Sequence, residues 1–303
     1  MSHVSNVWLI TGSSRGLGRE LATAVLAAGH RLVATARRPA DLADLVATYG
    51  ERVRAVALDV TDPAAARAAV AVATAAFGRL DVVVNNAGYA NVNAIEDVTE
   101  DDFRAQLETD FFGVVHVTRA ALPVLRAQGT GHIIQISSIG GRGGSPGLGA
   151  YQSAKWAVGG FSEVLAKEVG PLGIRVTIAE PGGMRTDWAG ASMRVDAVQP
   201  AYRDTVGAFA AQFRGQGDLA QSDPVKVAQA ILHVASMAEP PLRLLLGSDA
   251  VFLAGVLAAA RTAEDAAWHT LSVSTDVDGM PAFASTPVAG LLLAAQRASS
   301  PRT

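Results

Sequence analysis

Short apolar runs alternate with helical patterns along most of this 303-residue chain. The expected strands are 7–11, 31–36, 53–58, 82–84, 132–137, 174–179 and 242–246. The expected helices are 17–28, 42–48, 62–77, 100–127, 150–169 and 223–237, and Pro123 should kink or end the fourth of them early. Wholly apolar strands such as 82–84 are typical of a parallel sheet covered on both faces. The alternation therefore predicts a doubly wound α/β fold with right-handed crossovers.

Composition narrows the functional classes. Hydrophobic residues make up 50% of the chain and charged residues 17%, which is enough for a large core. The net charge of −3 gives no basic footprint for nucleic acid. The chain has no cysteine, which excludes disulfides, cysteine metal ligands and thiol nucleophiles. Its six histidines form no close metal-ligand spacing, so no metal site is expected.

The expected organisation is one domain over 1–247, with a substrate lid at about 190–217. A C-terminal helix near 249–268 and a tail from 279 should follow, packed on the same domain or partly disordered. The first six residues lack the basic start of a secretory signal. The late apolar run 251–260 is too short to cross a bilayer. A cytoplasmic protein without a membrane span is therefore expected.

A glycine-rich segment with the spacing G-x-x-x-G-x-G, formed by Gly12, Gly16 and Gly18, lies between the first strand and the first helix. Glycines there allow a tight turn and the close approach of a pyrophosphate, and the helix N-terminus offers free N–H groups to phosphates. The alternative is a turn that binds nothing. Asp59 and the run 85–88 argue against it, because each ends a later strand at the sheet edge where such folds bind ligands.

The choice of cofactor follows from the end of the second strand. Enzymes that use NAD place an acidic residue there to hold a ribose hydroxyl. This chain has Arg37 and Arg38 instead, and Arg15 in the glycine loop is a third guanidinium. Guanidinium forks suit a 2′-phosphate, so NADP(H) is predicted over NAD(H). The alternative is that these arginines are solvated surface charges.

The candidate catalytic residues are Ser138, Tyr151 and Lys155. Lys155 lies one helical turn after Tyr151, and its charge should lower the phenol pKa toward neutrality. The hydroxyl of Ser138, at the end of the preceding strand, is placed to hold a carbonyl oxygen against that phenol. Tyr-x-x-x-Lys alone also fits an ordinary amphipathic helix, so the prediction depends on the other motifs.

Taken together, these motifs over about 7–247 resemble the short-chain dehydrogenase/reductase (SDR) family of the classical type. The second half is most similar to the branch of 17β-hydroxysteroid and retinol dehydrogenases. The resemblance implies a three-layer Rossmann fold, with seven parallel strands and helices on both faces, and hydride transfer with NAD(P). It also implies a homodimer or homotetramer formed through the helices at 100–127 and 150–169.

The resemblance assigns a role to each matching position. Tyr151 is the general acid or base, Lys155 assists it and holds the nicotinamide ribose, and Ser138 orients the substrate oxygen, with Ser137 as a less favoured alternative. The positions that would bind the cofactor are Gly12, Ser14, Arg15, Gly16, Leu17, Gly18, Arg37, Arg38, Asp59, Val60, Asn86, Ala87, Gly88, Tyr151, Lys155, Pro181, Gly182, Met184 and Thr186.

One position departs from the family pattern. Asp110 stands where the family usually has an asparagine whose carbonyl holds a water near the lysine. A carboxylate beside Lys155 in a low-dielectric site should raise its own pKa and strengthen the pair, which would alter the pH dependence. The alternative is that Asp110 is a tolerated variant.

The substrate side is apolar and aromatic, which predicts a hydrophobic ketone, aldehyde or secondary alcohol. The predicted substrate residues are Ser138, Ile139, Gln152 and Trp188. Met184 and Trp188 are equally compatible with ordinary packing, and Arg142 either meets an anionic group of the substrate or is solvated. Two other functions stay open: a nucleotide-binding sensor that has lost catalysis, and an interaction protein that acts through its tail.

Overall fold

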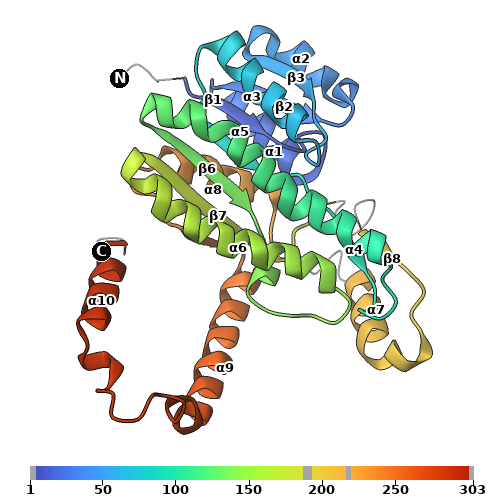
Figure 1. Ribbon diagram of the computed structural model, residues 1–303. Coiled ribbons are helices and arrows are strands. Elements are labelled where there is room, and N and C mark those ends of the chain that lie inside the picture. The colour runs from blue at the N-terminus through green and yellow to red at the C-terminus, as the bar shows by residue number, and fades with distance from the viewer. Residues whose placement is uncertain (1–4, 187–192, 216–219, 300–303) are drawn as a thin grey trace. The chain divides into compact units, whose positions relative to one another are not determined.

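The computed structural model describes residues 5–186, 193–215 and 220–299 (Figure 1). Its main sheet has seven strands in the order β3-β2-β1-β4-β6-β7-β9, and every pairing is parallel. The strands are β1 (Val7–Ile10), β2 (Arg31–Ala36), β3 (Val53–Ala57), β4 (Val82–Asn85), β6 (Gly131–Ile136), β7 (Ile174–Pro181) and β9 (Arg243–Leu246). The predicted doubly wound fold is confirmed, because the strand order reverses at β1, between β2 and β4.

Helices cover both faces of this sheet. One face packs against α1 (Gly16–Ala27), α2 (Ala43–Tyr49) and α8 (Pro224–Ser236). The other packs against α3 (Pro63–Phe77), α5 (Gly113–Gln128) and α6 (Gly149–Val169). Local signals define the helix ends: the Asp62 carboxylate accepts a hydrogen bond from the amide of Ala64 at 2.7 Å, and Gly78 adopts φ +77° after the last turn of α3.

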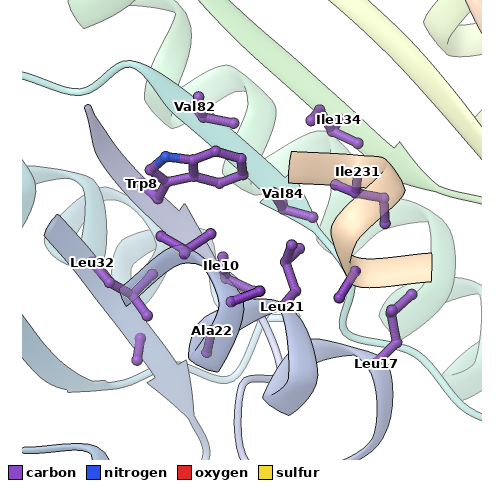
Figure 2. Close-up of a cluster of buried hydrophobic side chains, with 14 of the residues drawn as sticks. Trp8, Ile10, Leu17, Leu21, Ala22, Leu32, Val82, Val84, Ile134 and Ile231 are labelled. Carbon is purple, nitrogen blue, oxygen red and sulfur yellow. The ribbon is translucent and has the colours of Figure 1, made fainter. Parts of the chain in front are cut away.

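The core divides into two layers because successive strand residues point to opposite faces. In β1, Trp8 and Ile10 enter the cluster on the α1 side, whereas Val7 and Leu9 enter the cluster on the α5 side. Figure 2 shows the first cluster, in which Leu21 of α1 lies against strand residues. Burial on both faces explains why these strands are continuous apolar runs rather than alternating ones.

The fourth predicted helix differs from expectation. It consists of α4 (Glu100–Leu107), a π-helical turn η3 (Glu108–Phe112) and α5, and Pro123 lies inside α5 without ending it. The buried side chains of Ala121 and Leu125 flank Pro123, and their packing against the sheet offsets the lost backbone hydrogen bond. The irregularity occurs instead at η3, where Asp110 is fully buried.

Two further segments complete the described chain. Strand β5 (Ala90–Val92) pairs in parallel with β8 (Met193–Val195), which lies in the predicted lid, and α7 (Ala208–Gly215) follows. The chain separates into two compact units, Met1–Ala254 and Gly255–Thr303, and the division falls within α9 (Ser248–Val273). The second unit also contains η9 (Phe283–Ser285) and α10 (Pro287–Ser299). No helix among the described residues is long and apolar enough to cross a membrane.

The two-sided burial of the sheet predicts a large cost for truncating a central strand residue. Ile134 of β6 is 1% exposed, so Ile134→Ala is expected to lower the free energy of unfolding by about 2–5 kcal/mol. The matched control is Ile95→Ala at a site that is 75% exposed, where the change should stay within about 0.5 kcal/mol. Urea unfolding of both variants checks this, and equal costs would contradict the assignment of the core.

Candidate active site

The glycine loop forms a close-packed turn between β1 and α1. Gly12 and Gly16 have φ +68° and +54°, which L side chains rarely adopt. A Cβ on Gly18 would overlap the carbonyl oxygen of Gly12 and Nδ2 of Asn86. Gly12 and Gly16 therefore require glycine for the tight turn, and Gly18 requires it for close packing. The turn leaves backbone N–H groups at the helix start, and the approach of a pyrophosphate stays a prediction.

Thr11 and Asn86 tie this loop to the end of β4. Thr11 Oγ1 accepts hydrogen bonds from the amides of Asn86 and Ala87 at 2.8 and 2.9 Å. In return, Asn86 Nδ2 donates to the carbonyl oxygens of Thr11 and Gly12 at 2.9 and 3.2 Å. Thr11 was not among the predicted site residues, although its place immediately before the first glycine is a signal that sequence reasoning can use.

The start of α1 is suited to bind an anion. Its N-cap residue, Arg15, makes no capping hydrogen bond through its side chain, and the first turn has no acidic residue. Arg15, Arg37 and Arg38 are all exposed at this end of the sheet, and Arg38 forms an ion pair with Asp41 at 3.1 Å. The residues present therefore fit the phosphates of a dinucleotide.

The adenine side of the predicted cofactor site is less open than the sequence suggested. The exposed carboxylate of Asp59 accepts hydrogen bonds from the amide and hydroxyl of Thr61 at 3.0 and 2.8 Å. Val60 is 6% exposed and lies against Gly113, where a Cβ would overlap its side chain. Asp59 therefore has a local role in a turn, and its predicted contact with adenine stays a prediction.

The candidate catalytic residues meet at the carboxyl ends of the strands. Tyr151 and Lys155, on α6, are 7% and 4% exposed, and the Tyr151 phenol is hydrogen-bonded to Ser138. The Ser137 hydroxyl instead donates to the backbone carbonyl of Lys155 at 3.3 Å. This geometry favours Ser138 over Ser137 as the hydroxyl that faces the phenol.

The predicted lowering of the tyrosine pKa is wrong for this structure. Burial raises the pKa of Tyr151 well above its usual range; the hydrogen bond with Ser138 lowers it, and the charge of Asp110 raises it further. Lys155 Nζ lies 5.5 Å from the centre of the phenol ring, over its face, and donates to the carbonyl oxygen of Ile136 at 3.1 Å. Helical spacing predicted the neighbour correctly but not its position over the ring.

Asp110 lies close to Lys155, and its side chain is fully buried. Its Oδ2 is 3.9 Å from Lys155 Nζ, and its Oδ1 accepts from the amide of Tyr89 at 3.1 Å. Burial raises the pKa of Asp110 to about 6, against the opposing effects of Lys155, the Tyr89 amide and Gln106. The predicted direction for Asp110 is therefore confirmed, and Gln106 is a neighbour that the sequence did not reveal.

The segment after β7 lies beside the glycine loop. Pro181 ends the strand, the amide of Gly182 donates to the carbonyl oxygen of Leu246 at 2.9 Å, and the amide of Gly183 donates to the Asp249 carboxylate at 2.7 Å. Thr186 borders the loop, since its Cβ is 3.9 Å from the place a Cβ on Gly16 would take. Asp249, at the start of α9, was not predicted as a site residue.

The predicted substrate residues have mixed outcomes. Gln152 accepts a hydrogen bond from the amide of Ser145 at 2.7 Å, so its amide group holds the loop before α6. Arg142 pairs with the buried Glu180, which corrects both alternatives given for it. Met184 packs against the first core cluster, as the packing alternative predicted. Ile139 is half-buried beside Ser138, and Trp188 lies outside the described residues.

Comparisons with known proteins agree with this geometry. The sequence model of the family described as short chain dehydrogenase matches residues 6–197. The oxidoreductase BOA17 of Botryotinia fuckeliana is 54% identical over 273 residues, which cover 90% of this chain and 100% of that protein.

Two solved structures are similar to this one. A short-chain dehydrogenase from Streptomyces avermitilis has 41% identity and a TM-score of 0.85, covering 90% of this chain and 100% of its own. An alcohol dehydrogenase from the archaeon Thermococcus sibiricus, complexed with 5-hydroxy-NADP, has 25% identity and a TM-score of 0.66, covering 80% and 97%. The chain belongs to the short-chain dehydrogenase family, and it is an oxidoreductase of that family.

The raised pKa of Asp110 predicts a stability difference that depends on pH. The folded protein holds this proton more tightly than the unfolded chain, whose carboxyl has the ordinary value of 3.8, so wild-type stability falls as pH rises from about 4 through 6. Asp110→Asn removes this titration. Relative to wild type, the free energy of unfolding of the variant should increase by about 1–3 kcal/mol between about pH 4 and pH 8. Urea unfolding of both proteins at matched pH checks this. The other ionisable groups are the same in both proteins, so their effects cancel in the difference between the two free energies. A difference that is constant with pH would contradict it.

Proposed function

We propose that this oxidoreductase uses NADP(H) to interconvert a hydrophobic ketone or aldehyde and the corresponding alcohol. The observation that carries the proposal is the hydrogen bond between Ser138 and Tyr151, with the buried Lys155 over the phenol ring, at the same end of the sheet as the glycine loop. Two hydroxyls at one end of a nucleotide cradle suit a single carbonyl oxygen.

The residues would act as follows. The nicotinamide, when bound, supplies or accepts the hydride at the carbonyl carbon. Ser138 and Tyr151 hold the carbonyl oxygen, and Tyr151 gives that oxygen its proton as negative charge develops there. Lys155 then stabilises the phenolate, because a cation near the ring favours the charged form. The phenol carries its proton before the reaction, as the group that protonates the carbonyl oxygen must.

The arginines near the glycine loop support NADP(H) over NAD(H). No acidic residue follows β2 at the position where NAD enzymes hold the ribose hydroxyl. Among the residues that the structure describes, Arg15 and Arg37 have no ion-pair partner, whereas Arg38 is engaged by Asp41. Arg37, the first residue after the strand, is therefore the strongest candidate for a 2′-phosphate.

The assembly we propose is a homodimer or homotetramer formed through η3 and α6. Three large apolar side chains are exposed there: Phe112, Trp156 and Val164 are 40%, 46% and 57% exposed. Covering such side chains with the same faces of a second copy would remove this area from water. A location in the cytoplasm is part of the same proposal.

The acid role of Tyr151 can be tested directly. Tyr151→Phe removes the proton and should lower kcat for NADPH-dependent reduction by about 1,000-fold, with the Kd for NADPH little changed. The assay follows NADPH consumption against a panel of aliphatic, aromatic and steroid-like ketones and aldehydes. Turnover by the variant at the wild-type rate would exclude Tyr151 as the proton donor.

Cofactor choice is tested separately. Arg37→Ala should weaken NADPH binding about tenfold or more, because a charge-assisted contact to the phosphate is lost, and should leave NADH binding unchanged. Arg126→Ala is the matched control: it removes the same charge from an exposed arginine at the opposite end of the sheet. Fluorescence titrations of wild type and both variants with each cofactor give the six dissociation constants, and wild-type protein that binds NADH more tightly than NADPH would refute the preference.

A further inference from the structure

A fully buried carboxylate, Glu180, lies directly before the Pro181–Gly182 segment. Each of its oxygens is held by a different arginine. Arg142 Nε donates to Oε2 at 2.9 Å and its Nη2 donates to the same atom, while Arg243 Nη1 donates to Oε1. Arg243 also pairs with Glu163, on the outer side of α6, at 2.8 Å.

Stability alone does not account for this arrangement. Taking a carboxylate out of water is costly, and the two guanidinium groups mainly compensate for that cost. Replacing a buried ion pair by apolar residues of similar volume is often neutral or stabilising. What distinguishes this arrangement is geometric specificity, because two planar guanidinium groups hold the two carboxylate oxygens from different sides and fix the direction of the carboxylate.

The first end of the network is the turn that carries Ser138. Arg142 follows η4 (Ile139–Gly141), and its amide donates to the carbonyl oxygen of Ile139 at 2.9 Å. The amide of Gly141 donates to the carbonyl oxygen of Ser138, also at 2.9 Å. A Cβ on Gly141 would lie 3.0 Å from the carbonyl oxygen of Lys155, so the turn rests directly on the catalytic helix.

The other end of the network touches α6 and β9. Arg243 begins β9, and its guanidinium lies against Gly159, where a Cβ would come within 3.1 Å of Nη2. Gly159 lies one helical turn after Lys155. The three charged side chains thus contact the turn after Ser138, the helix of Tyr151 and Lys155, and the strand that ends at Pro181.

We propose that Arg142, Glu180 and Arg243 form a positioning network, which holds Ser138 and the Pro181–Gly182 segment in register with Tyr151. The three would act through the backbone segments they join rather than by binding substrate or cofactor. The inference rests on the proposed function, in which Ser138 and Tyr151 share one carbonyl oxygen beside the nicotinamide. Displacing a catalytic group by about 1 Å can cost about 100-fold in rate, so such a restraint affects catalysis strongly.

The kinetic test compares Arg142→Met with the conservative Arg142→Lys. We expect Arg142→Met to lower kcat by about 100-fold, with a smaller change in KM for the carbonyl compound and in Kd for NADPH. The isotope effect with NADPH deuterated at the transferred hydrogen should increase, because hydride transfer becomes rate-limiting. Arg142→Lys keeps the positive charge but loses the planar guanidinium group, so its kcat should lie between those of wild type and Arg142→Met.

The matched control is Arg79→Met. Arg79 forms the same type of pair with the buried Asp81, at 2.6 Å, but at the opposite end of the strands. The Arg79→Met variant should lose stability as Arg142→Met does, because a buried carboxylate loses its arginine. Its kcat per NADPH-binding site should stay at the wild-type value. An equal loss of kcat in Arg79→Met and Arg142→Met would overturn the proposal, because a general loss of stability would then explain both.

Hydrogen exchange gives a readout that does not need turnover. The amides of Gly141 and Arg142, both hydrogen-bonded within the turn, should exchange at least about tenfold faster in Arg142→Met and be unchanged in Arg79→Met. Unchanged exchange overturns the proposal, as does faster exchange with wild-type kcat. If the wild-type protein turned over no compound of the panel, the proposed function would fail, while the exchange result would still decide whether the network restrains the turn.

Discussion

The candidate active site depends on the hydrogen bonds that connect the ends of β1 and β4, where the strand order of the sheet reverses. Thr11 and Asn86 exchange hydrogen bonds across this point, and Gly18 lets α1 approach closely enough for Asn86 to reach the glycine loop. A parallel sheet opens a crevice there, because the following helices lie on opposite faces. The helix start, the arginines after β2 and the end of β4 therefore lie at the same end of the sheet without any dedicated structure to bring them together.

Electrostatics near the catalytic helix follow from burial rather than from sequence spacing. Asp110, Lys155 and Glu180 are at most 4% exposed, and each is paired with an opposite charge. Pairing of this kind depends on residues far apart in the chain, since Arg142 and Arg243 reach Glu180 from different elements. The same burial raises the pKa of Tyr151. The sequence predicted a lower pKa, because Lys155 lies one helical turn away.

This contrast explains what the sequence could and could not predict. Strands such as β1 and β4 are read from local apolar runs, and the glycine loop and Tyr151–Lys155 spacing depend on neighbours within one or two turns. The π-helical turn at 108–112, the pairing of Arg142 and the contact of Asp249 with Gly183 depend on tertiary packing. Such contacts cannot be predicted from local sequence patterns, because the residues that make them are far apart in the chain. The branch similar to 17β-hydroxysteroid and retinol dehydrogenases stays a prediction for a related reason, because it concerns the substrate side.

The aspartate at position 110 changes the balance of charge around Lys155 and Tyr151. An asparagine there would leave the charge of Lys155 uncompensated and available to stabilise a phenolate on Tyr151. Ionised Asp110, 3.9 Å from Lys155 Nζ, offsets that charge and itself raises the pKa of Tyr151. The phenol therefore keeps its proton more firmly than it would beside a neutral amide. A phenol that holds its proton more firmly is a weaker acid, so the residue that departs from the family pattern acts on the same proton that the proposed reaction transfers.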